Sequence, residues 1–399
     1  MSDPTATAAA APPPFTDELQ RFRAHLRAFI ARELAPHAAE WERARSFPNQ
    51  VFATLAAEGY LGLKYPAELG GGAVSGEGFR VGGVLADAVL SEELARCGSG
   101  GLAAGIGAHI GIATPPIWIF GTPEQQRRYL PAAIRGERIG ALAITEPGAG
   151  SDVAGIRTRA RRVNGGFVVN GSKLFITNGV RADFLVTAVT TGEGAGGHHG
   201  LSFLIIDRGP GVHSSPIEKL GWHASDTALI AFEDVFAPEE NLLGQENEGF
   251  YLIMGNFQWE RLLMALGAVG AMTWALERTL PVARELGRRR GGDAQALRHR
   301  VAEIAVGLQA ARDLTYHALR LHAEGRDALR EVTMAKLATQ RRCHDVLDAC
   351  LQIHYDAAGA ASEAQVADLE RGVRDARLGP IGGGTDEIMR EILGRSLGL

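Results

Sequence analysis

The hydrophobic and polar positions divide the chain into a helical first third, a β-rich middle and a helical remainder. In residues 15–45, apolar side chains recur at intervals of three and four among charged ones, a spacing that predicts an amphipathic helix. Residues 81–96 and 123–135 repeat this pattern. Thr122-Pro123-Glu124 is typical of a helix start with proline in its first turn. The first third is therefore predicted to be helical.

Near residue 140 the pattern changes to short β-rich runs. Phe167-Val168-Val169 and Leu174-Phe175-Ile176-Thr177 flank Asn170-Gly171. Because Asn-Gly readily supplies the positive φ angles of a tight turn, these two runs predict a β-hairpin. Further β-rich runs lie at 183–190, 201–207 and 228–236, with loops at 191–200 and 208–216.

From residue 250 onward the helical pattern returns. Residues 250–286 predict one long apolar-rich helix, with Pro281 as a candidate kink. Shorter helices are expected at 293–325, 327–359, 362–377 and 386–397. The predicted organisation is a disordered tail at 1–14, a helical domain at 15–140, a small β domain at 141–247 and a helical domain at 248–399.

Composition and charge narrow the class of protein. The 399 residues are 46% hydrophobic and 22% charged, which is typical of a globular chain. The net charge of −5 gives no support to nucleic-acid binding. The three cysteines, Cys97, Cys343 and Cys350, form no CxxC pair and favour a reduced, cytoplasmic protein.

Membrane insertion and metal binding are not expected. The longest apolar stretch, 101–121, contains His109 and Pro115-Pro116 and is too interrupted to predict a membrane span. Residues 2–14 lack the basic start and apolar core of a signal peptide. His198-His199 lies in a glycine-rich loop without a third ligand, so an exposed loop is favoured over a metal site.

The first stretch that indicates chemistry is 143–152, Ala-Ile-Thr-Glu-Pro-Gly-Ala-Gly-Ser-Asp. Such a strand end followed by a glycine-rich loop exposes backbone N–H groups and hydroxyls, which can lie against a planar polar ring or an anion. An ordinary Pro-Gly turn is the alternative, and it explains the whole ten-residue string poorly.

The second stretch is Phe257-Gln258-Trp259-Glu260-Arg261. On a helix, Glu260 shares a stripe with Ile253, Phe257 and Met264, so its carboxylate would be partly desolvated and a stronger base. The residue pattern alone favours the alternative, a glutamate at the edge of the stripe that is solvated or paired with a neighbouring arginine.

The loop at 143–152 and the run Phe175-Ile176-Thr177-Asn178-Gly179 together resemble the acyl-CoA dehydrogenase flavoproteins. The run Lys219–Thr227 and the segment Phe232-Glu233-Asp234-Val235 extend the resemblance, which covers about 15–399. It implies a mainly α fold with a central β domain: an N-terminal helical domain, a small β barrel or sandwich domain and a C-terminal four-helix bundle.

The resemblance also implies the cofactor FAD and a set of contacts. The isoalloxazine ring is expected against Ile144, Thr145, Phe175 and Thr177. The full set of expected FAD contacts is Leu142, Ile144, Thr145, Gly150, Ser151, Phe175, Ile176, Thr177, Arg284, Gln352, Thr385 and Glu387. The expected substrate contacts are Ser151, Phe257, Arg261 and Gly384.

The resemblance changes the interpretation of Glu260. Most of the family carries its catalytic glutamate just before a Gly-Thr pair, where this chain has Gly383 in the segment 380–390. The long-chain and isovaleryl branches carry the glutamate in the long helix, directly before an arginine, and Glu260-Arg261 is similar to that arrangement. Glu260 is thus implied as the base, and the backbone N–H at Gly383 as a group that polarises the thioester carbonyl.

Two segments depart from the family pattern for the dinucleotide. Arg284 is kept, but Gly287-Arg288 stands where Phe-Gly is expected. Gln352 is also kept, whereas His354-Tyr355-Asp356-Ala357-Ala358 replaces a glycine loop. Larger side chains hinder close approach of the backbone to a pyrophosphate, so binding of the AMP half of FAD is expected to differ, with Arg288–Arg290 as a compensating charge.

The expected activity is FAD-dependent α,β-dehydrogenation of an acyl thioester, with Glu260 taking the α-proton and flavin N5 the β-hydride. The thioester is acyl-CoA or an acyl carrier protein, and an electron-transferring flavoprotein is the expected acceptor. A flavin oxidase or monooxygenase on this scaffold, or a binding protein that has lost FAD, is the alternative. A homodimer or homotetramer is expected, since Leu262, Leu266, Val269 and Met272 suggest apolar surface for a partner.

Overall fold

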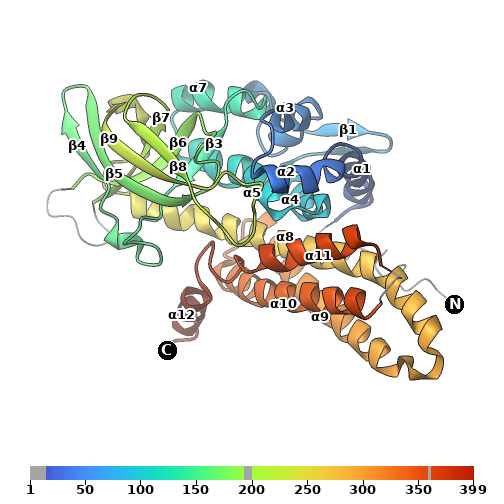
Figure 1. Ribbon diagram of the computed structural model, residues 1–399. Coiled ribbons are helices and arrows are strands. Elements are labelled where there is room, and N and C mark those ends of the chain that lie inside the picture. Colours follow the sequence, from blue (N-terminus) through green and yellow to red (C-terminus); the bar gives the residue numbers. More distant parts are fainter. Residues whose placement is uncertain (1–14, 193–199, 358–360) are drawn as a thin grey trace. The chain divides into compact units, whose positions relative to one another are not determined.

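The computed structural model describes residues 15–192, 200–357 and 361–399 (Figure 1). The chain divides into two compact units. Among the described residues, the sheet unit comprises Glu40–Gly72 and Gly101–Glu260, and the bundle unit comprises 15–39, Ala73–Gly100 and Arg261–Leu399. The expected tail at 1–14 and His198-His199 lie outside the described residues.

The sheet unit contains one eight-stranded sheet, in the order β10-β7-β6-β4-β5-β9-β8, with β3 paired to β6. Most neighbouring strands are antiparallel, whereas β6 runs parallel to both β3 and β4. The strands are β3 (Gly140–Ala143), β4 (Arg159–Val163), β5 (Gly166–Ile176), β6 (Phe184–Thr190), β7 (Leu201–Asp207), β8 (Val212–Pro216), β9 (Ala228–Pro238) and β10 (Leu242–Leu243).

Alternation along the central strands gives the sheet two apolar faces. On β6, Phe184 and Val186 belong to one core cluster and Leu185 and Val189 to another. The first cluster includes Tyr129 and other helical residues, so this face packs against helices. The helices of the unit are α2 (Ala38–Ala44), α3 (Gln50–Ala57), α5 (Gly100–Gly107), the π-helix Ala108–Ala113, α6 (Pro115–Phe120) and α7 (Pro123–Ile134).

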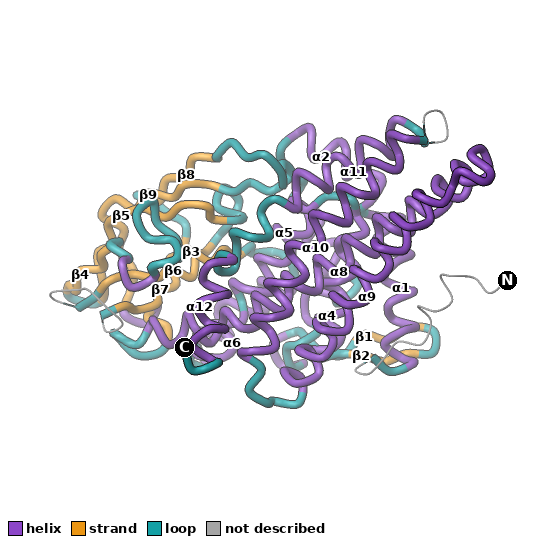
Figure 2. The backbone as a smooth tube through the Cα atoms, turned by 90° about the horizontal axis from the view of Figure 1, so that it is seen from below, coloured by secondary structure: helices purple, strands orange, loops and turns teal. Residues whose placement is uncertain are grey.

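In the bundle unit, α8, α9, α10 and α11 run side by side around an apolar core (Figure 2). Their bounds are α8 (Gly249–Arg290), α9 (Gln295–Ala323), α10 (Leu329–Asp356) and α11 (Glu363–Ala376); α8 begins in the sheet unit. The bundle unit also contains α1 (Asp17–Glu33), β1 (Val74–Gly76), β2 (Phe79–Val81), α4 (Gly83–Leu94) and α12 (Asp386–Ser396).

The structure corrects two predicted elements. Asn170-Gly171 is not a hairpin turn, because β5 continues through it with a register shift against β9, and Gly171 takes a φ of +145°. The turn that joins two antiparallel strands is at Asn164-Gly165, between β4 and β5, where Gly165 has a φ of +78°. The helix predicted over 15–45 is interrupted near Pro36, where a short 3-10 turn separates α1 from α2.

Three further differences concern helices and a short strand. The long helix extends to Arg290 and continues through Pro281. Residues 212–216, predicted as loop, pair with β9 as strand β8. The stretch Gly100–Phe120 is long and apolar enough to cross a membrane, but 67% of its most apolar 18-residue window is buried inside the protein, as in the core helix of a globular protein.

Candidate active site

A buried ion pair shapes the loop that follows β3. Lys173 is 0% exposed, and its Nζ donates to Ile144 O at 2.9 Å and to Glu146 Oε1 at 2.8 Å. The Glu146 carboxylate also accepts from the backbone N–H groups of Arg157 and Thr158 at 2.7 and 2.9 Å. Burial lowers the pKa of Lys173 to about 8, although Glu146 opposes this shift. The loop is therefore tied to β5 on both sides of Thr145.

A strained turn of β5 lies beside that loop. Phe175 has a φ of +62°, within a register shift of β5 against β9, and the residue is 62% exposed. The N–H of Leu174 donates to Thr145 O at 2.8 Å, which joins the two segments. An aromatic residue held exposed in a left-handed conformation is unfavourable for folding alone, and such strain is concentrated at functional sites.

The other predicted contacts of this region differ in their accessibility. Ile176 is buried in the sheet core, so only its backbone can face a ligand. Leu142 and Thr177 are half-buried, whereas Gly150 and Ser151 are exposed. The loop and the strained turn thus form one surface that combines backbone polar groups, hydroxyls and an aromatic face.

Glu260 lies on α8 among apolar side chains. Ile253 is buried, Phe257 is half-buried against the helical face of the sheet core, and Trp259 is buried with Lys64 Nζ 5.8 Å from its ring centre. Glu260 itself is half-buried, and its Oε2 is buried. One turn earlier, the amide of Asn256 donates to Ile112 O at 3.3 Å, which ties α8 to the π-helix.

Arg261, the next residue, belongs to the bundle unit and holds the turn at 382–385. Its side chain is 4% exposed, and Nε donates to Gly383 O at 3.2 Å. Lys336 on α10 donates from Nζ to Gly384 O at 2.6 Å. The side chain of Thr385 caps α12 by accepting from the N–H of Ile388 at 3.3 Å. Gly383 and Gly384 have φ values of +63° and +97°.

The residues expected at the AMP half of FAD are spread over the bundle unit. Arg284 on α8, Gln352 on α10 and Glu387 on α12 are all exposed. The departures from the family pattern are helical here: Gly287-Arg288 lies within α8, and α10 continues to Asp356. Ala358 lies outside the described residues.

The residues present fit one half of FAD better than the other. The exposed Phe175 ring and the adjoining loop offer a face and polar groups to an isoalloxazine ring. At the segment expected for the AMP half, His354 is buried and hydrogen-bonded to Thr279 Oγ1 at 3.3 Å, and Asp356 pairs with Arg300 at 2.7 Å. No glycine cradle for a pyrophosphate is formed by the described part of this segment.

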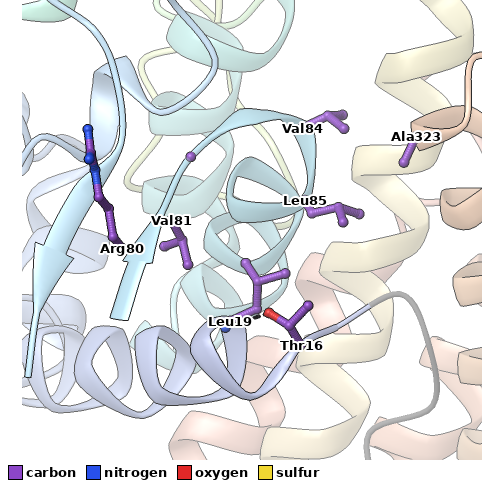
Figure 3. A pocket seen from close by; sticks show the side chains of 8 residues that line it. Thr16, Leu19, Arg80, Val81, Val84, Leu85 and Ala323 are labelled. Atoms are coloured by element: carbon purple, nitrogen blue, oxygen red, sulfur yellow. Dashed lines mark hydrogen bonds between the residues drawn. The ribbon is translucent and has the colours of Figure 1, made fainter. Parts of the chain in front are cut away.

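The structure thus brings together two groups of predicted residues: Ile144, Thr145 and Phe175–Thr177 in the sheet unit, and Arg261, Gly383 and Gly384 in the bundle unit. Sequence reasoning missed the lysines that hold them, Lys173 and Lys336. Lys336 stands between the apolar residues Ala335 and Leu337, a position that could have indicated a buried charge, whereas Lys173 follows Asn170-Gly171-Ser172 and carries no such signal. A pocket of about 350 Å³ in the bundle unit contains none of the predicted site residues (Figure 3).

Comparison with known proteins places most of the chain in one family. Models of the N-terminal, middle and C-terminal domains of acyl-CoA dehydrogenase match residues 16–137, 141–235 and 247–398. The chain is 35% identical to the mitochondrial long-chain specific acyl-CoA dehydrogenase of Mus musculus, over 96% of this chain and 87% of the relative. It is also 35% identical to the mitochondrial isovaleryl-CoA dehydrogenase of Solanum tuberosum, over 96% and 91%. The solved structure of a probable acyl-CoA dehydrogenase from Mycobacterium abscessus superposes with a TM-score of 0.86 at 38% identity, covering 96% of this chain and 99% of that one.

Proposed function

Because the chain belongs to the acyl-CoA dehydrogenase family, whose members are FAD-dependent oxidoreductases acting on acyl thioesters, we propose that Glu260 is the base that removes the substrate's α-proton. The observation that carries the proposal is the burial of Glu260 Oε2 on a largely apolar stretch of α8. The turn at 382–385, where most of the family places its glutamate, contains Gly383 and no acidic side chain.

The residues of this chain serve a proton transfer that is difficult in water. An α C–H bond is a weak acid, so its proton leaves only if a strong base meets it and the thioester oxygen is stabilised as negative charge develops. A partly desolvated carboxylate is a stronger base than a solvated one. The backbone N–H of Gly383 is the proposed donor to the thioester oxygen, and FAD, when bound, supplies the acceptor for the β-hydride.

The buried guanidinium of Arg261 has a positioning task in this scheme. Its hydrogen bond to Gly383 O orients the turn that is proposed to bind the thioester carbonyl. The contact of Arg261 with the CoA part of the substrate stays a prediction, as do Phe257, Ser151 and Gly384 as substrate contacts and Ile144, Thr145 and Phe175 as ring contacts.

The finer assignments are also proposals. The substrate is an acyl-CoA, with a carrier-protein thioester as the alternative carrier, and the acceptor is an electron-transferring flavoprotein. The domains are 15–140, 141–247 and 248–399, a division supported by the ranges of the three family models. A cytoplasmic location is supported by three buried free thiols.

A homodimer or homotetramer is still proposed, but the apolar side chains that suggested it in the sequence do not support it. Leu262, Leu266, Val269 and Met272 are fully buried within the chain, so they offer no surface to a partner. Support comes instead from α9, where Val306 is exposed beside alanines on the outer face. Light scattering of the FAD-saturated protein tests the proposal, and a folded monomer contradicts it.

The base is tested with Glu260→Gln, which keeps the shape and removes the basicity. Mixing the holoenzyme anaerobically with a panel of acyl-CoA thioesters should bleach the flavin of the wild type. In the variant, bleaching and α-proton exchange in D₂O should fall by about 10²–10⁴-fold while FAD stays bound. The matched control is Glu248→Gln, an exposed glutamate just before α8, which should behave as wild type. Wild-type rates of proton exchange in Glu260→Gln would contradict the assignment of Glu260 as the base.

A further inference from the structure

Lys336 is a buried ammonium whose purpose the fold alone does not explain. It lies on α10 between the apolar residues Ala335 and Leu337, and its side chain is 0% exposed. Removing a lysine from water is costly unless its charge is used in an interaction. Its Nζ donates to Gly384 O at 2.6 Å, so the charge is directed at the turn before α12.

A second buried cation acts on the preceding peptide of the same turn. Arg261 on α8 donates from Nε to Gly383 O at 3.2 Å. Two successive carbonyls are therefore held by two cations from two different helices. Because the C=O and N–H of a trans peptide point in opposite directions, the N–H groups of Gly384 and Thr385 are directed away from Arg261 and Lys336.

The backbone of the turn is suited to presenting N–H groups. Gly383 and Gly384 have φ values of +63° and +97°, a backbone conformation that other residues adopt only with strain, so glycine is favoured at both positions. Among the residues that the structure describes, none accepts a hydrogen bond from the N–H of Gly383, Gly384 or Thr385. Successive N–H groups in such a turn form a concave site for negative charge.

We propose that Lys336 is a positioning residue for the reaction: it fixes and polarises the Gly384–Thr385 peptide so that the turn stabilises negative charge on the thioester oxygen. Hydrogen bonds in a chain strengthen one another, so the Lys336 ammonium makes the Thr385 N–H a better donor, and this N–H adds to the Gly383 N–H in stabilising the same negative charge. The inference rests on the proposed function, because it takes the thioester oxygen as the group that the turn receives.

The probe is acetoacetyl-CoA, a β-ketothioester whose α-proton is acidic enough to ionise without oxidation. When it is titrated into the holoenzyme, the ultraviolet absorbance of its enolate reports the pKa of the bound α-proton. The variants are Lys336→Met, which removes donor and charge, and Lys336→Arg, which keeps both. Thr339→Val is the matched control, since Thr339 is buried on the same helix and its hydroxyl donates to the backbone carbonyls of Ala335 and Lys336 within α10.

We expect Lys336→Met to raise the α-proton pKa of the bound probe by about one unit or more and to lower kcat by about 10–100-fold, part of the loss expected for an oxyanion donor. KM should change much less, Lys336→Arg should recover part of the pKa shift, and Thr339→Val should match the wild type. If Lys336→Met does not fold, Lys336→Gln is measured under the same criterion. An unchanged α-proton pKa in the folded variant overturns the inference, whereas a wild type that binds acetoacetyl-CoA without forming the enolate counts against the proposed function itself.

Discussion

Replacing Lys173 by methionine tests whether the buried ion pair holds the loop that is proposed to contact FAD. The substitution keeps most of the side chain's volume and leaves the Glu146 carboxylate with two backbone donors but no cation. Breaking a buried pair by removing one partner costs about 3–5 kcal/mol, because the remaining charge is uncompensated. We expect this loss of stability at pH 7, together with weaker FAD binding.

The pH dependence of the free energy of unfolding provides a second test of the burial of Lys173. The pKa of Lys173 falls from 10.5 to about 8 in the folded protein, so between these values the unfolded chain binds more protons than the native one. Stability of the wild type should therefore rise with pH across this window, by up to about 3 kcal/mol at about 1.4 kcal/mol per pKa unit. Lys173→Met should lack that rise.

The assay is urea unfolding of the holoenzyme, followed by tryptophan fluorescence at pH 7 and pH 10, with the FAD dissociation constant measured by flavin fluorescence. The matched control is the double variant Lys173→Met with Glu146→Gln, which removes the stranded charge and should recover part of the stability. A single variant that loses less than about 1 kcal/mol and keeps wild-type FAD affinity would refute the positioning role of the pair.

Two further predictions concern buried charges and a buried imidazole. His109 is fully buried, and burial lowers its pKa from 6.5 to about 4. As pH falls through this window, the protein should therefore lose up to about 3 kcal/mol of its free energy of unfolding. Urea unfolding at pH 7 and pH 5 should show that the stability of His109→Gln depends less on pH than that of the wild type. Arg23 forms ion pairs with Glu92 and Glu93 at 3.0 and 2.6 Å inside the bundle unit, so Arg23→Met should destabilise by about 3–5 kcal/mol, and an unchanged melting temperature would contradict this expectation.

Periodicity predicts the helices and most strands because their burial follows the spacing of apolar residues. The long helix at 250–286 corresponds to α8 and the run at 183–190 to β6. The same reasoning fails at Asn170-Gly171, since a positive φ suits a bulge as well as a hairpin turn, and only pairing with β9 decides between them. β8 was missed because its residues are mostly exposed and carry no alternation.

The residues of the candidate site also differ in how far the sequence predicts them. Thr145 and Glu260 could be predicted as site residues because each lies in a short sequence motif that resembles a family, and their roles stay predictions. The residues that orient the site could not be predicted in this way. Lys173 and Lys336 act through hydrogen bonds to carbonyl oxygens that lie 29 and 48 positions away along the chain. Lys336, between Ala335 and Leu337, nevertheless carries a signal that the sequence shows. A lysine in an apolar run is seldom buried without a partner, so it predicts an acceptor elsewhere in the chain, and here that acceptor belongs to the turn proposed to contact the substrate. Lys173 follows Asn170-Gly171-Ser172 and has no such signal.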